Sequence, residues 1–203
     1  MSMDVYLDSG LQDGQNLLGI DPRKFARMEI NAINRAGRRI KRVLIVEPLN
    51  AATHVRKPVL NERIRLRTAT NKTPMATIVP SSRGIQARLY KHRAGTGSGS
   101  RARILVAWVK GEKVAAGFIN PRGTRRMPLA TRSERERKVK NAKRARLSPD
   151  VKSYRYEWGP VPRNALGPSA AAMFAEHVTA DVRGQAADIL AEEFNAELDK
   201  VLY

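Results

Sequence analysis

The chain has 203 residues, no cysteine and a formal net charge of +19 at pH 7. The lack of cysteine excludes disulfides and thiolate metal sites, and the length is enough for one sizeable hydrophobic core. No apolar run approaches the roughly 20 residues of a membrane helix, and the N-terminus lacks the basic head and apolar core of a secretory signal. We therefore expect synthesis in the cytoplasm and no membrane contact.

The positive charge is concentrated in the middle of the chain. Residues 1–20 contain three acids and no Lys or Arg, and residues 164–203 contain seven acids against two cations. With these eight net negative charges set aside, the total of +19 requires +27 for residues 21–163. A field of this size indicates a polyanionic partner or acidic protein neighbours.

Residues 1–20 are polar and punctuated by glycine, which predicts an N-terminal arm. Asp21-Pro22 is a helix start, because Asp caps a helix and Pro suits its first position. Apolar residues recur at helical spacing over Phe25–Leu44, so we expect this helix to run to about Val46, ahead of Pro48. Much of the rest of the helix is basic, with a role that the spacing leaves open: Arg27, Arg35, Arg38, Arg39, Lys41 and Arg42.

The next stretch admits two interpretations. Pro58 could open a second helix, whereas Arg63–Arg67 alternates polar and apolar side chains as a strand does; we favour the helix. Ala76–Val79 and Gly84–Tyr90 are then predicted to be strands, separated by the turn-like Pro80–Arg83.

A Gly-rich stretch, Gly95–Ser100, precedes the most apolar part of the chain. It leads into a strand rather than a helix, so the helix amides that hold a phosphate are missing and a flexible connection between strands is favoured. Within Arg103–Asn120, two β-favouring runs flank a polar turn containing Gly111, which predicts a hairpin. Its first run, Ile104–Val109, is apolar at every position, so we expect cover on both faces.

Residues 121–153 are predicted to form a basic, poorly anchored excursion. Residues 132–146 hold eight Lys or Arg against two Glu and almost no apolar side chain, so burial alone cannot fold them. We expect contact with DNA or an acidic partner through Arg122, Arg125, Arg126, Arg132, Arg135, Arg137, Lys138, Lys140, Lys143, Arg144 and Arg146. Tyr154, Tyr156 and Trp158 alternate as on a strand, and a sheet edge is favoured over stacking on bases.

The C-terminal part predicts a long amphipathic helix or a helix pair, with Gly184 as the candidate break. Its apolar residues follow one another at strict four-residue steps. We expect this stripe to be core or a subunit interface: Phe174, Val178, Val182, Ala186, Leu190, Phe194, Leu198 and Leu202.

The sequence contains no recognisable catalytic or metal-binding motif. The three histidines, His54, His92 and His177, lie far apart and in no ligand spacing. The few acids of the basic middle are better explained as partners of nearby basic residues than as a two-metal site: Glu112, Glu134, Glu136, Asp150 and Glu157. We therefore predict that the protein is not an enzyme and needs no cofactor.

Together the elements predict an α+β fold. We expect an antiparallel sheet with a central hairpin, covered by the N-terminal basic helix and by the long C-terminal amphipathic helix or helix pair. Residues 1–20 would be the arm, and residues 21–203 would form a single α+β domain carrying the excursion.

Three pieces of the sequence carry a resemblance. They are Ala32–Arg35 with Glu62–Leu66; Gly117–Ile119 with Gly123 and Arg126; and Pro162 with Ala165–Ser169 and Met173-Phe174. In this order they resemble the phage minor tail protein Z family, the tail-completion proteins of long non-contractile tails.

The resemblance implies a structural virion protein at the head-proximal end of the tail, in a homo-oligomeric ring around the DNA channel of the head–tail junction. Its partners would be the tail terminator, the tail tube or tape-measure proteins and the head–tail connector, with the genome end in the lumen as a further contact. The alternative is a free, sequence-independent nucleic-acid-binding protein, such as a nucleoid or packaging factor. Acidic ends beside a basic middle favour the virion protein, because such surfaces suit docking between subunits.

Overall fold

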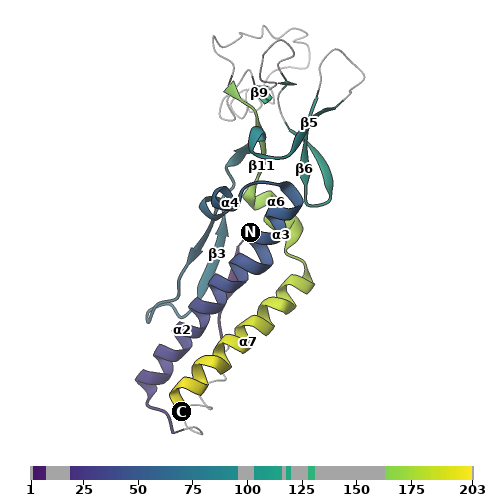
Figure 1. Cartoon of the computed structure of the whole chain (residues 1–203). Coiled ribbons are helices and arrows are strands. Elements are labelled where there is room, and N and C mark those ends of the chain that lie inside the picture. Colours follow the sequence, from purple (N-terminus) through teal and green to yellow (C-terminus); the bar gives the residue numbers. More distant parts are fainter. Residues whose placement is uncertain are drawn as a thin grey trace, which may run out of the picture. The chain divides into compact units, whose positions relative to one another are not determined.

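The computed structural model confirms the α+β class, with helices and antiparallel sheets in one chain (Figure 1). The chain divides into two compact units: unit 1 is Met1–Arg83 with Ser169–Tyr203, and unit 2 is Gly84–Pro168. The structure describes residues 2–7, 19–95, 103–115, 118–119, 128–130 and 163–202. Among these residues, no helix is both long and apolar enough to cross a membrane.

Helix α2 (Pro22–Ile40) begins where the sequence predicted a start. The Asp21 side chain accepts a hydrogen bond from the backbone N–H of Arg23 at 2.7 Å, and Pro22 lies in the first turn, where its missing N–H is not needed. Most of the expected apolar stripe is buried, and Val43, at 37% exposed, is the exception: Phe25, Met28, Ala32, Ile33, Ala36, Ile40 and Leu44 are buried.

The first helix does not end ahead of Pro48, so that prediction is wrong. Helix α2 continues into the π-helix η1 (Lys41–Val46) and then into α3 (Glu47–Thr53), which ends at His54 with a φ of 58°. The wider π turn places Pro48 in the first turn of α3, the one place where a helix accepts proline readily. The helical course therefore continues about two turns further than expected.

Unit 1 contains a three-stranded antiparallel sheet in the order β1-β3-β2. Strand β3 (Ala76–Pro80) lies where the sequence predicted one, and it is the central strand. Strand β1 (Met3–Val5) pairs with β3, Met3 opposite Ile78, and Val5 is buried. This part of the predicted arm is therefore an edge strand.

The segment with two interpretations contains both a helix and a strand. Helix α4 (Lys57–Arg63) has Pro58 in its first turn, and β2 (Ile64–Arg67) follows it directly. The favoured helix is thus correct for α4 and wrong for β2. The alternation was the stronger signal in β2, because Ile64 is buried and Leu66 half-buried while the two arginines between and after them are exposed.

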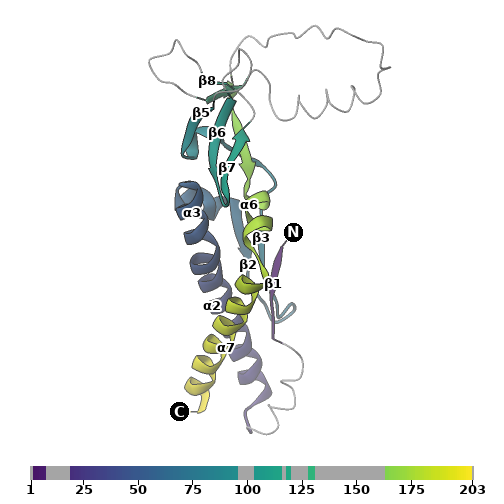
Figure 2. The same cartoon turned by 90° about the vertical axis from the view of Figure 1, so that its right-hand side faces the viewer.

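Helix α2 lies against this sheet (Figure 2). A Cβ atom at Gly37 would lie 3.2 Å from Leu66 Cδ1 and 3.5 Å from Ala76 Cβ, so helix and sheet approach closely there. The Asn34 side chain donates to the Ala69 carbonyl at 3.1 Å and accepts the Ala69 N–H at 2.8 Å. These contacts hold the β2 edge beside the middle of α2.

The C-terminal part is a helix pair, α6 (Ala170–His177) and α7 (Ala180–Leu202). The break lies at Val178 and Thr179 and not at Gly184, which sits inside α7 where a Cβ would point into open space. The Thr179 carbonyl accepts the first hydrogen bond of α7, from the Arg183 N–H. Threonine is a favoured helix cap, and this was the local signal for the break.

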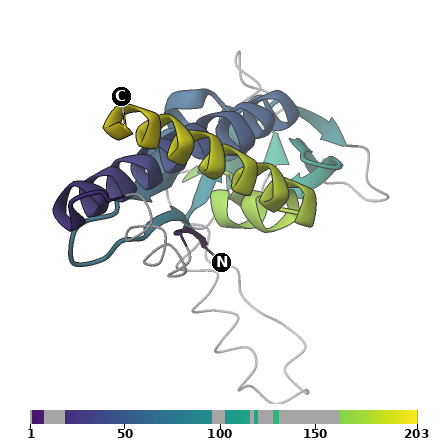
Figure 3. The ribbon, with the colours of Figure 1, turned by 90° about the horizontal axis from the view of Figure 1, so that it is seen from below.

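Helix α7 runs beside α2 (Figures 1 and 3). The predicted stripe is correct in α6 and at the junction, where Phe174 and Val178 are buried, and only partly correct in α7. There, Val182, Leu190, Phe194 and Leu198 are half-buried, Ala186 is buried and Leu202 is 45% exposed. Four-residue steps advance about 40° around a helix at each step, so such a stripe turns away from a single partner.

Unit 2 contains the strands of the predicted hairpin region. Strand β5 (His92–Gly95), β6 (Arg103–Trp108) and β7 (Gly111–Ala115) form an antiparallel sheet in that order, with Trp108 opposite Gly111 and Gly111 at a φ of 85°. Only one face of β6 is fully buried, through Ile104, Val106 and Trp108; Leu105, Ala107 and Val109 are half-buried. The expectation of full cover on both faces is met on one face.

The predicted strand Gly84–Tyr90 is shorter than expected. It ends after β4 (Gly84–Gln86), which pairs with β11 (Leu166–Ser169), and the 3-10 turn Ala87–Leu89 follows. Just after β4, the Ala87 N–H donates to the carbonyl of Ala165, the residue before β11, at 2.8 Å.

A third small sheet has the order β10-β9-β8. Its strands are β8 (Phe118–Ile119), β9 (Pro128–Ala130) and β10 (Arg163–Asn164). Strand β9 lies within the predicted excursion, so three of that segment's residues are paired in a sheet.

Candidate functional site

The predicted contact residues of the excursion cannot be placed. All eleven, from Arg122 to Arg146, lie outside the residues that the structure describes, and so do Tyr154, Tyr156 and Trp158. Contact through them stays a prediction.

A second set of basic residues gathers on unit 1. Arg35 and Arg39 lie four residues apart, as do Arg38 and Arg42, so the two pairs form neighbouring rows on one side of α2 and of the start of η1. Two open hollows border this side. One is lined by Arg35, Arg38, Arg39, Arg42 and Glu193, and the other by Arg38, Lys41, Arg42, Asn61, Arg65 and Leu66. We call these six basic residues (Arg35, Arg38, Arg39, Lys41, Arg42 and Arg65) the arginine face.

Helix α7 neutralises one side of the arginine face. Arg35 Nη1 lies 2.5 Å from Glu197 Oε1, and Arg39 Nη1 lies 2.6 Å from Glu192 Oε2 and 3.3 Å from Glu193 Oε1. The hydrogen bonds that Arg39 donates to Glu192 and then to Glu193 raise the pKa of Arg39. These acids were expected to serve docking between subunits, and three of the seven C-terminal acids instead form ion pairs within the chain.

The other side of the arginine face keeps its charge. In the described part of the chain, no carboxylate lies within ion-pair distance of Arg38, Arg42 or Arg65. The Arg38 Nε donates to the Asn34 carbonyl at 3.1 Å, which orients its guanidinium without neutralising it. Burial lowers the pKa of Lys41, whose Nζ lies 3.4 Å from the Asn61 carbonyl. Three guanidinium groups therefore remain available to an anion.

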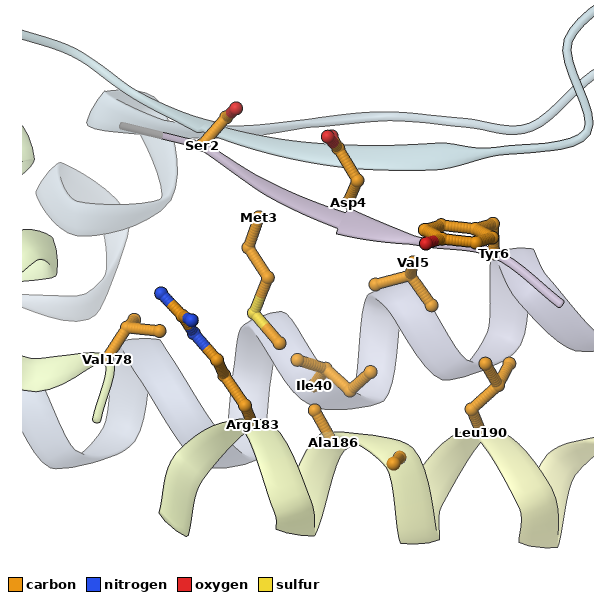
Figure 4. Close-up of a pocket in the computed structure, with 11 residues that line it drawn as sticks. Ser2, Met3, Asp4, Val5, Tyr6, Ile40, Val178, Arg183, Ala186 and Leu190 are labelled. Atoms are coloured by element: carbon orange, nitrogen blue, oxygen red, sulfur yellow. The ribbon is translucent and has the colours of Figure 1, made fainter. Parts of the chain in front are cut away.

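A different hollow lies between β1, α2 and α7 (Figure 4). Met3 and Val5 point into it from the strand, towards Ile40, and Arg183 reaches into it from α7. Its floor is apolar, and the side chains around it form no acid–base or nucleophilic set. The hollow is therefore a groove between packed elements, and Arg183 is the cation that reaches into it.

Glu112 of the predicted hairpin pairs with a basic residue of strand β5. Arg93 Nε and Nη2 donate to the two carboxylate oxygens of Glu112 at 2.7 and 2.6 Å, across β6. This hydrogen bonding lowers the pKa of Glu112. The prediction that Glu112 pairs with a nearby basic residue is confirmed, whereas Glu134, Glu136, Asp150 and Glu157 lie outside the described ranges.

The histidines also act separately. His54 ends α3, His92 Nδ1 lies 3.0 Å from the Tyr90 carbonyl, and His177 Nε2 donates to the Leu44 carbonyl at 2.7 Å. Over the ranges that the structure covers, no three His, Asp or Glu side chains are grouped as metal ligands.

Sequence reasoning identified the arginines of α2 but did not recognise them as a site. The signal was their three- and four-residue spacing, which sets one basic face beside the apolar stripe. Arg65 was missed because its strand was predicted to be a helix. No family model, curated protein or solved structure matches the chain.

Proposed function

We propose that the chain is a structural virion protein that completes a long non-contractile phage tail at its head-proximal end. It would act by contact and without catalysis, as a ring of identical subunits around the DNA channel. Its neighbours would be the tail terminator, the tail tube or tape-measure proteins and the head–tail connector. The resemblance of three sequence pieces to the minor tail protein Z family supports this proposal.

The observation that carries it is the distribution of charge over the arginine face. The acids of α7 balance Arg35 and Arg39, yet Arg38, Arg42 and Arg65 have no carboxylate partner among the described residues. A surface that leaves three guanidiniums uncompensated suits a polyanion, and a tail junction encloses one.

We also include in this proposal the expectation from the sequence that helices cover the hairpin. In this proposal, helices cover the half-buried face of β6 that Leu105 and Ala107 form. Burying it further would add apolar contact at a small entropic cost, because the strand is already ordered by its two neighbours.

The alternative is a free, sequence-independent nucleic-acid-binding protein. It gains support from α7, because Glu192, Glu193 and Glu197 form ion pairs within the chain and so no longer argue for docking between subunits. The arginine face serves either function, so oligomeric state and particle phenotype must separate them.

Two measurements test the proposal together. Native mass spectrometry of the purified protein should show a closed homo-oligomer, and electron microscopy of particles made without it should show filled heads and finished tails that remain separate. A monomer whose loss leaves joined, infectious particles would contradict the virion function and favour the alternative.

A further inference from the structure

We propose that the arginine face of unit 1 is a binding site for the phosphodiester backbone of duplex DNA, centred on Arg38, Arg42 and Arg65. This inference rests on the proposed function for the presence of DNA, and it names the surface of the chain that DNA would contact. It is independent of the excursion between residues 121 and 153.

The ion pairs with α7 make the two sides of the arginine face different in charge. Glu192, Glu193 and Glu197 hold Arg39 and Arg35 on the α7 side, so an anion that approaches from that side meets carboxylates. On the β2 side, Arg38, Arg42 and Arg65 line a hollow in which every charged side chain is positive. The field therefore guides a polyanion to the groove between α2 and β2.

The guanidinium groups are suited to phosphate. Each offers several N–H donors in a planar fork that matches two phosphate oxygens at once. Arg38 Nε is already held by the Asn34 carbonyl at 3.1 Å, so its terminal N–H groups point from a fixed position. Arg38 and Arg42 line both hollows, and together they can hold neighbouring phosphates of one strand.

The composition of the face favours nucleic acid over an acidic protein. Apart from Glu193 on the α7 side, the two hollows are lined by basic and amide side chains, and Leu66 is the one apolar side chain among their lining residues. Protein interfaces usually centre on buried aromatic or aliphatic anchors, whereas interfaces with DNA are polar and strongly positive. Contacts of this kind carry no sequence information, so binding should not depend on base sequence.

The test is a triple substitution, Arg38→Gln, Arg42→Gln and Arg65→Gln, in the full chain. Its matched control is Arg23→Gln, Lys24→Gln and Arg27→Gln, which removes the same charge from the exposed first turns of α2. Both variants are checked by circular dichroism melting. Binding to two duplexes of unrelated sequence is then measured by fluorescence anisotropy over about 50 to 200 mM salt.

The triple variant should bind both duplexes more weakly and with a flatter salt dependence. The log–log slope should fall by about 0.9 for each phosphate that the variant no longer neutralises, or about 2.7 for three. The control should keep most of the wild-type slope. An unchanged slope in the triple variant, or an equally large fall in the control, would overturn the inference.

An acidic peptide separates DNA from protein as the partner. If polyglutamate binds the wild type and loses affinity in the triple variant while duplex binding does not change, the face contacts protein and the inference is wrong. The readout uses purified protein only. A slope that depends on these arginines supports the inference even where particles join normally and the virion function fails.

Discussion

Arg38 and Arg39 are sequence neighbours with different surroundings. Arg39 pairs with Glu192 and Glu193, whereas Arg38 contacts a backbone carbonyl and keeps its charge exposed. The 100° between successive residues of a helix turns one towards α7 and the other towards β2. At the residue scale, then, the useful information is which side of α2 each arginine occupies.

Tyr90 gives a pH-dependent prediction for unit 2. The residue is 3% exposed, its hydroxyl donates to the Pro168 carbonyl at 2.8 Å, and burial raises the pKa of Tyr90 above its usual value. The folded state therefore holds the phenolic proton more tightly than the unfolded state does. The stability from this group is complete below about pH 10 and is lost as the pH rises towards the folded-state pKa.

Urea unfolding above about pH 10 should show the free energy of unfolding fall by up to about 1.4 kcal/mol per pH unit from this group. Tyr90→Phe has no proton to lose, so its curve should be flatter over the same range. Parallel curves for the two proteins would show that Tyr90 titrates normally.

At the scale of elements, a hydrogen bond from His177 joins two helical segments that are distant in the sequence, at a carbonyl that Pro48 leaves without a backbone donor. Within an α-helix the Leu44 carbonyl would accept the N–H of residue 48, but Pro48 has none. His177, the last residue of α6, supplies a donor to that carbonyl at 2.7 Å. The long helical course through η1 thus has a partner more than a hundred residues away in sequence.

His177→Ala should lower the free energy of unfolding by about 0.5–1.5 kcal/mol, the net contribution of a typical hydrogen bond, because this one is part-buried. His177→Gln, which retains a side-chain N–H, should recover part of the loss. In a Pro48→Ala background the backbone regains a donor, so His177→Ala should cost less there. Equal costs in both backgrounds would show that the two residues are not coupled.

The different burial of three side chains in the helix pair predicts that their substitutions by alanine differ in their effect on stability. Phe174 is fully buried, Phe194 is half-buried with its ring centroid 6.4 Å from that of Phe25, and Leu202 is 45% exposed. Phe174→Ala should cost about 3–5 kcal/mol, and Phe194→Ala less than this because part of its ring already meets water. Leu202→Ala should stay within about 0.5 kcal/mol.

Thermal or urea unfolding of the three variants provides the measurement. A Phe25→Ala, Phe194→Ala double-mutant cycle should give a coupling of about 0.5–1.5 kcal/mol, as edge-to-face aromatic pairs do. A larger loss of stability for Phe194→Ala than for Phe174→Ala would mean that α7 is more deeply packed than the structure shows.

At the scale of the whole molecule, charge is the dominant property. The net charge of +19 repels itself in the folded state, whereas the ion pairs between α2 and α7 attract. Each of these pairs has a partly exposed arginine that water screens, so the three pairs do not offset a repulsion spread over 38 cations.

The melting temperature should therefore rise as NaCl is increased from about 20 to 200 mM, because the screening length shrinks to about 10 Å or less. The double variant Glu192→Gln, Glu193→Gln removes two attractive charges, so its melting temperature should rise more steeply. A melting temperature that falls with salt would show that the ion pairs outweigh the repulsion.

The site was predictable only in part. The sequence supplied the arginines of α2 and their spacing, and it located the acids of α7 at the other end of the chain. It could not show that Glu193 meets Arg39 while Arg38 has no acidic neighbour in the described structure, because that depends on where α7 lies against α2. Contact through the excursion is still untested, since its basic residues lie outside the described ranges.

By itself the sequence determined the features that depend on local patterns. The start of α2 at Asp21 and Pro22, its buried stripe and strand β3 all follow from capping, from 3.6-residue spacing and from β-branched runs. The tertiary structure alone decided the pairing of β1, the helical path through Pro48 and the neutralisation of Arg35 and Arg39. Each of these depends on a partner distant in the chain, whose contribution to the free energy outweighs the local preference of the segment it contacts.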